Sequence, residues 1–437
     1  MTSREPDPHI RADHPYPTLP PGVRVCDDDR AAGDWFFYRD RELVVHAEDL
    51  ARVQESLRVL GVDRKHYEPT VSSAERPLVR FQFSVEAPDT IELFRQLRFG
   101  DPDHGHEPLE PGQVEPGPPR VWPNHVVGLQ YHTNWGAGSL PRPHPPLSAL
   151  PTGDNLPGAG VRVGVLDSGI EDQAWFDQHW FPAAGRSRVD VEEQPGAGNT
   201  LPYQCGHGTF CTGTVLQHAP GADVIVDRVD STSGVLDDWQ LHLRLAAMLD
   251  PANEIDVLNL SLGGYTADNR PLPCACDVLA AALEADPELV VVASAGNDGH
   301  DRPVWPAAMR GVVGVGAVAA DGTRWSLSNF GEWVNAWSAG EDLPSTFLSW
   351  PSGRPPRTGI LDPGPRPTDA EEHCEVRFDG WASWTGTSFA AARVSGAIAA
   401  ELKRDGRSPR EVVFDLVTNA STPFESGGLV VPATYVS

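Results

Sequence analysis

The sequence lacks long apolar runs. No stretch of its 437 residues reaches the ~18–20 apolar residues that a membrane-spanning helix needs. The opening MTSREPDPHIRADHPYPTLPPG also has no apolar segment of the kind found at the centre of a secretory signal. We therefore expect neither a membrane span nor an export signal, and a chain that opens on Met1 without them is expected to be cytoplasmic.

Cysteine is scarce, and basic residues are outnumbered. Six cysteines are too few for a disulfide scaffold, so we expect free thiols. Cys274 and Cys276 have a spacing that metal sites use, but no second pair at ligand spacing accompanies them. A formal net charge of −27 repels nucleic acid phosphates and anionic lipid, so neither nucleic acid nor a membrane is an expected partner.

The first half of the chain contains a polar segment and a small domain. Residues 1–34 are polar and proline-rich, which predicts a flexible segment. Residues 35–129 alternate between strand and helix patterns in the β-α-β-β-α-β order of a ferredoxin-like α+β domain. The clearest patterns are ELVVH at 42–46, the helical 47–61, PLVRFQFSV at 77–85, the helical 89–99 and VWPNHVVGL at 121–129.

The second half of the chain has a different pattern of apolar and polar residues. Residues 130–157 form a Pro/Gly-rich linker, and residues 158–437 contain short runs of β-branched residues separated by polar or helical segments. This pattern predicts an α/β domain with a doubly wound, mostly parallel sheet. The apolar runs are 161–169, 222–229, 255–264, 288–297 and 311–319, and the helical connectors are 235–250 and 277–286.

Three segments of this domain supply the groups of one reaction. VGVLDSG ends a strand on Asp167, CGHGTFC places His207 between glycines, and GTSFAAARVSG places Ser388 at a helix start. A serine hydroxyl attacks well only when a base takes its proton, and a histidine does so when a carboxylate fixes its tautomer. The three residues are therefore a candidate Asp–His–Ser triad.

A fourth segment, ASAGNDG, places Asn297 directly after a buried strand. Acyl transfer builds negative charge on the carbonyl oxygen, and a side-chain amide together with the Ser388 N–H would stabilise it. We therefore predict that Asn297 belongs to an oxyanion hole.

The motifs D-S-G, G-H-G-T, S-L-G-G, A-G-N and G-T-S-x-A, in this order, resemble those of the subtilisin-like (subtilase) serine peptidases across 158–437. The resemblance implies a serine endopeptidase in which Asp167 orients, His207 is the base, Ser388 attacks and Asn297 stabilises the oxyanion. The implied reaction needs no cofactor. The resemblance allows structural calcium, but the sequence contains no clear calcium-binding loop.

The resemblance also implies where a protein or peptide substrate binds. Two backbone strands would flank it, and a floor near Val304 and Trp305 would accept neutral, apolar P1 side chains. The strand residues implied by the motifs are Thr232, Ser233 and Gly234 on one side, and Ser261, Leu262 and Gly263 on the other.

The sequence departs from the family pattern at three places. Phe389 and Ala392 stand where the family usually has methionine and proline. Neither residue takes part in proton transfer, so we expect the catalytic reaction to be unaffected by these two differences. Residues 341–380 are longer than the usual connection before the serine, and such long connections are often functional or disordered.

Each motif alone has an ordinary structural explanation, and other functions fit parts of the pattern. An α/β-hydrolase would need the order Ser, acid, His, whereas both partners here precede Ser388. A catalytically retired binding protein would normally have lost a triad residue, and none is missing.

Cys205 and Cys211 lie on either side of His207 in the sequence. We expect both to be buried thiols, and the alternative is that they make the site sensitive to oxidation or to metals.

The small domain at 35–129 has two possible roles. Secreted relatives carry a ferredoxin-like pro-domain that assists folding and inhibits the enzyme, and the resemblance implies that this domain restrains the active site. A permanent regulatory or partner-sensing domain is the alternative, because a chain without an export signal has no export step at which to shed it.

Overall fold

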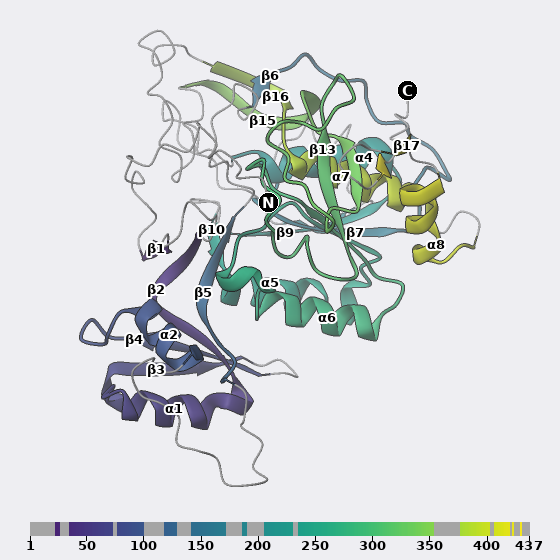
Figure 1. Ribbon diagram of the computed structural model, residues 1–437. Helices are drawn as coiled ribbons and strands as arrows, with labels where there is room; N and C mark the ends of the chain where they lie inside the picture. The colour runs from purple at the N-terminus through teal and green to yellow at the C-terminus, as the bar shows by residue number, and fades with distance from the viewer. Residues whose placement is uncertain are drawn as a thin grey trace, which may run out of the picture.

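The computed structural model describes most of both domains (Figure 1). The described residues are 22–26, 35–72, 77–99, 118–128, 141–171, 186–189, 205–229, 235–353, 376–402, 406–419, 422–423 and 429–430.

The N-terminal domain is an antiparallel sheet with two helices. The sheet order β10-β5-β2-β4-β3 contains the four-strand order of a ferredoxin-like fold, with a strand of the second domain added at one edge. Its elements are β1 (Val23–Cys26), β2 (Phe36–His46), α1 (Leu50–Val59), β3 (Tyr67–Val71), β4 (Leu78–Phe83), α2 (Thr90–Phe99) and β5 (Val121–Gly128). The predicted order of strands and helices is therefore confirmed.

The second domain is a three-layer α/β structure. Its nine-stranded sheet runs β17-β18-β14-β13-β12-β11-β7-β9-β8, and every pairing except β17 with β18 is parallel. The strands are β7 (Arg162–Asp167), β8 (Arg186–Val189), β9 (Asp223–Arg228), β11 (Val257–Leu260), β12 (Val290–Ser294), β13 (Val312–Val318), β14 (Ala336–Ala339), β17 (Thr422–Pro423) and β18 (Leu429–Val430). This confirms the predicted doubly wound, mostly parallel sheet.

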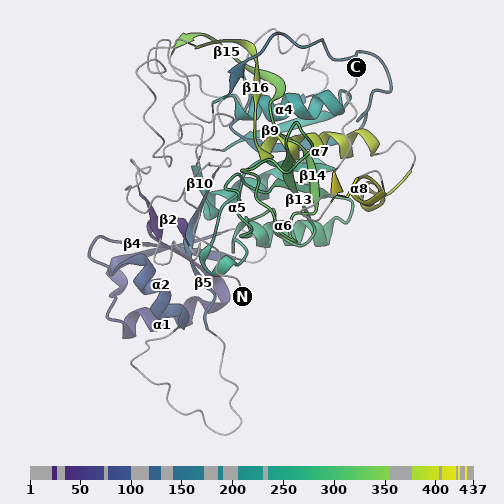
Figure 2. The same ribbon diagram turned by 45° about the horizontal axis from the view of Figure 1, so that its top comes forward.

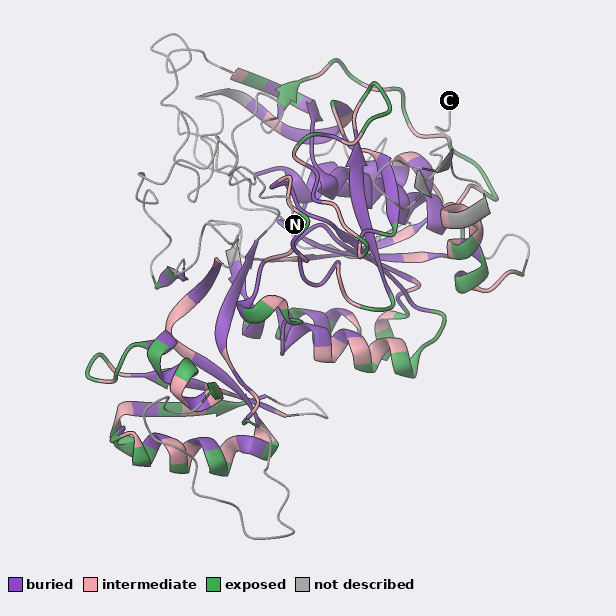
Figure 3. Cartoon of the chain, in the orientation of Figure 1, coloured by how far each residue is buried: buried purple, intermediate pink, exposed green. Residues whose placement is uncertain are grey.

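Helices cover both faces of that sheet (Figures 1 and 2). α4 and α7 pack on one face over a core that includes Phe210 and Phe389, and α5 and α6 pack on the other. The helices are α4 (His207–His218), α5 (Asp238–Met248), α6 (Ala275–Ala285), α7 (Thr387–Glu401) and α8 (Pro409–Phe414). The strands read as continuous β-branched runs because both faces are buried, as Figure 3 shows.

Strand β7 lies where the strand order reverses. β9 and β8 follow it on one side, and β11, β12, β13 and β14 follow on the other. In open α/β sheets, ligands bind at the carboxyl ends of the strands at such a reversal. The carboxyl end of β7 is Asp167.

Four sequence predictions differ from the structure. Val23–Cys26, in the segment expected to be flexible, forms β1 and pairs with β2. The segment 235–250 was expected to be helical throughout, but Val235–Asp237 forms β10 because it pairs with β5. In the long connection at 341–380, β15 (Leu343–Gly353) and β16 (Val376–Trp384) pair with each other, and β6 (Arg142–Pro143), in the predicted linker, pairs with β16.

The two domains share a hydrophobic core. One cluster joins residues of the small domain, among them Phe36 and Leu43, to Tyr265, Ala267 and Val304 of the large one. Among the helices in the described part of the chain, none is long and apolar enough to cross a membrane.

Candidate active site

Asp167 is held at the end of β7 in a buried turn. Its side chain is fully buried, and Oδ1 accepts the Ser168 N–H at 2.7 Å. The turn continues through Gly169, whose φ of +94° favours glycine. Within the described residues, Asp167 Oδ2 is buried and has no hydrogen-bond partner.

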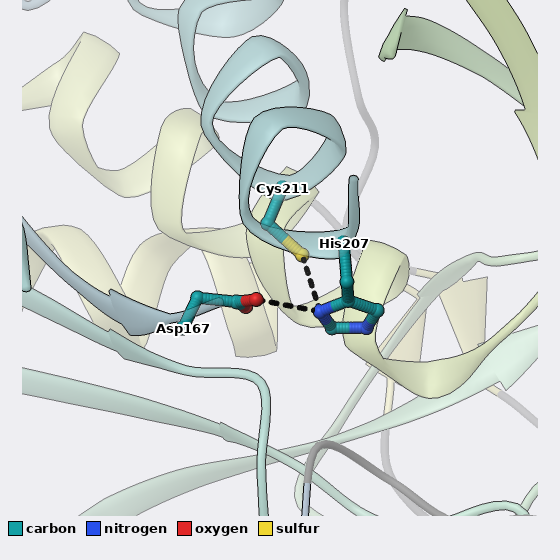
Figure 4. A group of neighbouring side chains, drawn as sticks. All are labelled: Asp167, His207 and Cys211. Atoms are coloured by element: carbon teal, nitrogen blue, oxygen red, sulfur yellow. Dashed lines mark hydrogen bonds and ion pairs between the residues drawn. The ribbon is translucent and has the colours of Figure 1, made fainter. Parts of the chain in front are cut away.

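His207 is the first residue of α4 and faces this turn. The ring Nδ1 lies 2.8 Å from Asp167 Oδ1 (Figure 4), and because a carboxylate only accepts, Nδ1 carries the proton. The flanking glycine Gly208 permits the approach, since a Cβ there would lie 2.1 Å from the Gly169 carbonyl oxygen. The structure therefore brings the predicted acid and base together.

Cys211 lies one helical turn after His207, with Sγ 3.8 Å from the ring Nδ1 (Figure 4). Burial, and second the Asp167 carboxylate, raise the pKa of the Cys211 thiol well above its ordinary value, so the thiol is neutral. Within the described residues, Asp167, His207 and Cys211 form a group whose potential ligand atoms lie within 4.8 Å of one another. A cation there would compete with the Asp167–His207 hydrogen bond for Nδ1.

The other described cysteines are also buried, and none of them is in a disulfide with another described cysteine. They are Cys26, Cys205, Cys274 and Cys276.

Ser388 lies at the start of α7, beside the start of α4. Gly396 fits against Val215 and His218, because a Cβ on this glycine would lie 2.7 Å from the Val215 carbonyl oxygen. The Phe389 ring, next in sequence to Ser388, lies 5.3 Å from the His207 ring between centroids, so the two helix starts lie side by side. The predicted base and nucleophile therefore approach the same place from neighbouring helices.

A buried polar network joins Ser388 to β11. The Ser388 hydroxyl donates to the Ser261 carbonyl oxygen at 3.4 Å, and the Ser261 hydroxyl donates to the Ser388 carbonyl oxygen at 2.9 Å. Asn259 donates to the Ser261 hydroxyl at 3.0 Å and accepts from Ser395 of α7 at 2.9 Å. Fully bonded buried networks of this kind fix the relative position of the elements they join.

The amide of Asn297 is oriented by Thr387. Its Oδ1 accepts both the Thr387 N–H and the Thr387 hydroxyl at 2.9 Å. That hydroxyl in turn accepts the Gly296 N–H at 3.1 Å. Asn297 Nδ2 consequently faces the start of α7, 3.8 Å from where a Cβ on Gly386 would lie.

Aromatic rings pack around His207. Trp384 meets the imidazole edge-on at 5.5 Å between centroids, and Phe389 lies at 5.3 Å. Phe389, which replaces the methionine usual in the family pattern, also packs on Phe210 at 4.4 Å. The departure from the pattern is thus accommodated by ring packing in the core.

The predicted substrate strands are only partly described. Thr232, Ser233 and Gly234 lie outside the described residues. Gly263 exchanges both backbone hydrogen bonds with Gly128 of β5, at 2.9 and 3.1 Å.

The predicted P1 floor lies close to residues 295–300, the loop that carries Asn297, which we call the oxyanion loop after the predicted role of Asn297. Val304 is 3% exposed, packs in the core shared by the two domains, and lies 3.2 Å from where a Cβ on Gly296 would stand. Trp305 exchanges backbone hydrogen bonds with Gly264, which follows the predicted strand Ser261–Gly263.

Two polar residues of β5 bind backbone groups of the second domain, and sequence reasoning did not assign them. Asn124 Oδ1 accepts the Trp239 N–H at 3.2 Å, at the start of α5. His125 Nε2 accepts the Ala267 N–H at 3.0 Å. The signal was visible, since both are polar residues in the middle of an otherwise apolar strand.

His125 makes interdomain packing sensitive to acid. Burial, and second the charge of Arg302, lower the pKa of His125 to about 3 from its ordinary 6.5. The unfolded chain therefore binds a proton between these values that the folded chain does not, and stability present above pH 6.5 is lost as the pH falls. Lowering the pH from 6.5 to 4.5 should cost up to about 2.7 kcal/mol of unfolding free energy.

Urea unfolding of the native protein and of the His125→Gln variant across this range measures the effect. Glutamine keeps an acceptor for Ala267 and does not titrate, so the stability difference between the two proteins should change with pH. A pH-independent difference would contradict the assignment.

Comparison with known proteins relates this site to a family. A family model described as the subtilase family matches residues 158–429. Subtilisin NAT of Bacillus subtilis subsp. natto is 28% identical over 262 residues, covering 53% of this chain and 63% of that protein. The intracellular serine protease of Paenibacillus polymyxa is 27% identical over 294 residues, covering 64% of this chain and 76% of that protein.

A solved structure extends the likeness to both domains. Fervidolysin from Fervidobacterium pennivorans, a keratinolytic enzyme related to subtilisin, matches with a TM-score of 0.58 and 16% identity over 95% of this chain and 61% of that chain. At this identity the match concerns the fold alone. The chain spans 63% of the length of the first two subtilisins it matches.

Proposed function

Because the chain belongs to the subtilase family, we propose that it is a serine endopeptidase that cleaves peptide bonds through an acyl-enzyme on Ser388. The observation that carries this proposal is the buried 2.8 Å contact between His207 Nδ1 and Asp167 Oδ1, beside the helix that carries Ser388. The tautomer that this contact fixes leaves Nε2 as the basic nitrogen.

The steps follow from these positions. The Ser388 hydroxyl leaves Ser261, gives its proton to His207 Nε2 and attacks the peptide carbonyl carbon. Asp167 stabilises the imidazolium that forms. His207 then protonates the leaving amine, and water hydrolyses the acyl-enzyme by the reverse path. All these steps use groups of the chain itself, so no metal or organic cofactor is part of the proposal.

The oxyanion is bound by Asn297 Nδ2 and the Ser388 N–H in this proposal. Thr387 holds the carbonyl end of the Asn297 amide, so that its NH₂ end faces the start of α7. A donor fixed in advance needs no reorganisation when charge develops on the substrate, which is why such donors lower the barrier.

A neutral, apolar P1 preference is the second part of the proposal. Val304 is apolar and lies against the oxyanion loop at Gly296, and a basic side chain there would need a carboxylate partner. Profiling of a peptide library should show kcat/KM at least about 10-fold higher for apolar than for Lys or Arg P1 residues. A profile dominated by basic P1 residues would overturn this preference.

Restraint by the N-terminal domain is the third part. β5 pairs with β10 and continues to Gly128, which forms hydrogen bonds with both the N–H and the carbonyl oxygen of Gly263. A substrate strand bound along Ser261–Gly263 would need the same groups. The docked domain therefore competes with extended substrates for this edge.

Truncation tests the restraint. Residues 158–437 alone should hydrolyse an extended peptide faster than the whole chain, and adding residues 1–157 in trans should reverse the gain. If the isolated second domain is folded but no faster, and the added fragment changes nothing, the N-terminal domain instead recruits partners.

An intracellular location is a further part of this proposal. It is supported by the likeness to the intracellular serine protease of Paenibacillus polymyxa. Detection of the chain in the culture medium rather than in the cell fraction would contradict it.

A further inference from the structure

The side chain of Asn329 forms hydrogen bonds with the backbone of the loop that carries Asn297. Asn329 Oδ1 accepts the N–H groups of Asp298 and His300, at 3.1 and 2.9 Å. Asn329 Nδ2 donates to the Ala295 carbonyl oxygen at 3.0 Å. The residues on both sides of Asn297 are therefore tied to the same buried amide.

Tyr265 completes this arrangement. Its hydroxyl accepts the second Nδ2 proton of Asn329 at 3.0 Å and donates to Asp298 Oδ2 at 2.9 Å. Burial, and second the Asp298 carboxylate, raise the pKa of Tyr265 well above its ordinary value, so the phenol remains a donor. Without this hydroxyl, a buried donor on Asn329 and a buried acceptor on Asp298 would lose this partner.

The N-terminal domain covers the ring of Tyr265. Trp35 meets it edge-on with centroids 4.9 Å apart. The Arg302 guanidinium lies over the Tyr265 ring, 4.6 Å from its centroid, and donates to the carbonyl oxygens of Trp35 and Thr266. Tyr265 thus lies between the docked domain and the oxyanion loop.

We propose that Tyr265 is a positioning residue for the Asn297 amide, and that the N-terminal domain supports catalysis by fixing Tyr265 through Trp35. The inference rests on the proposed function, because it requires Asn297 to bind the oxyanion. Oxyanion donors act at about 2.7–3.1 Å, so a small displacement of the loop weakens them. The N-terminal domain then has two opposed effects: it blocks the Gly263 edge against extended substrates, which is the larger effect for such substrates, and it holds the oxyanion loop in place, which is the effect that a small substrate reports.

The test uses the full-length chain and p-nitrophenyl acetate, a small ester that does not need the Gly263 edge. Tyr265→Phe should lower kcat about 10-fold with KM unchanged, because only the transition state carries the oxyanion. Trp35→Leu should lower kcat in the same way, and Trp35→Phe should restore it. Tyr67→Phe, which removes a buried phenol from the N-terminal core, is the matched control and should leave kcat unchanged.

A double-mutant cycle separates positioning from general stability. In an Asn297→Ala background, Tyr265→Phe should change kcat less than about 2-fold, because the amide it positions is gone. An equal loss in both backgrounds, or no loss in the native background, would overturn the inference. If Asn297→Ala itself leaves kcat unchanged, the proposed oxyanion hole fails instead. Should Tyr265→Phe not fold at the assay temperature, Trp35→Leu takes its place in the cycle.

Discussion

Replacing Ser388 with alanine should lower kcat for peptide hydrolysis about 10⁶-fold, the size of the loss known for removal of the nucleophile from subtilisin, a relative of this chain. The acyl-enzyme cannot form without the hydroxyl, and only uncatalysed attack by water remains. The substitution removes one oxygen from a well-packed helix start, so the thermal unfolding midpoint should stay close to that of the native protein.

His207→Ala should cause a loss of similar size, because the base and the nucleophile act as a unit. His218→Gln is the matched control: His218 is a buried histidine at the other end of α4, and its replacement should leave kcat nearly unchanged. Peptide hydrolysis that persists in folded Ser388→Ala protein would exclude Ser388 as the nucleophile.

Asn297→Ala has the second largest expected effect. Loss of one oxyanion donor lowers kcat about 10²–10³-fold, a range again known from subtilisin, while KM changes little. The reason is that the amide binds charge that exists only in the transition state. Steady-state kinetics on a peptide substrate measures both constants.

Asn335→Ala serves as the control for that substitution. Asn335 is an exposed asparagine that donates to the Val312 carbonyl oxygen at the start of β13. Its replacement should not change kcat. A raised KM with unchanged kcat in Asn297→Ala would place this amide in substrate binding instead of oxyanion binding.

The sequence was informative where burial alone decides structure. The β-branched runs that became β7, β9, β11, β12 and β13 were identified because strands covered on both faces are continuously apolar. β15 and β16 were missed because their residues are polar, aromatic and proline-containing, and they are strands through pairing with each other and, for β16, with β6. β10 was assigned to a helix for the same reason, since its strand partner is in the other domain.

The four site residues could be predicted because each stands in a short local motif, and the structure brings two of them, Asp167 and His207, into contact. The residues that orient them had no such signal. Thr387 binds Asn297 across 90 positions of sequence, and Tyr265 binds Asn329 across 64. Contacts between segments so far apart depend on the folded sheet, so a single sequence could not reveal them.

The most direct test of the central claim is to label the purified chain with a small fluorophosphonate and identify the modified residue by mass spectrometry. The probe reacts with an activated serine and does not need the substrate edge at Gly263. We predict one adduct, on Ser388, that is absent from the His207→Ala protein. A folded native protein that remains unlabelled, or that is labelled at another serine, would contradict the account.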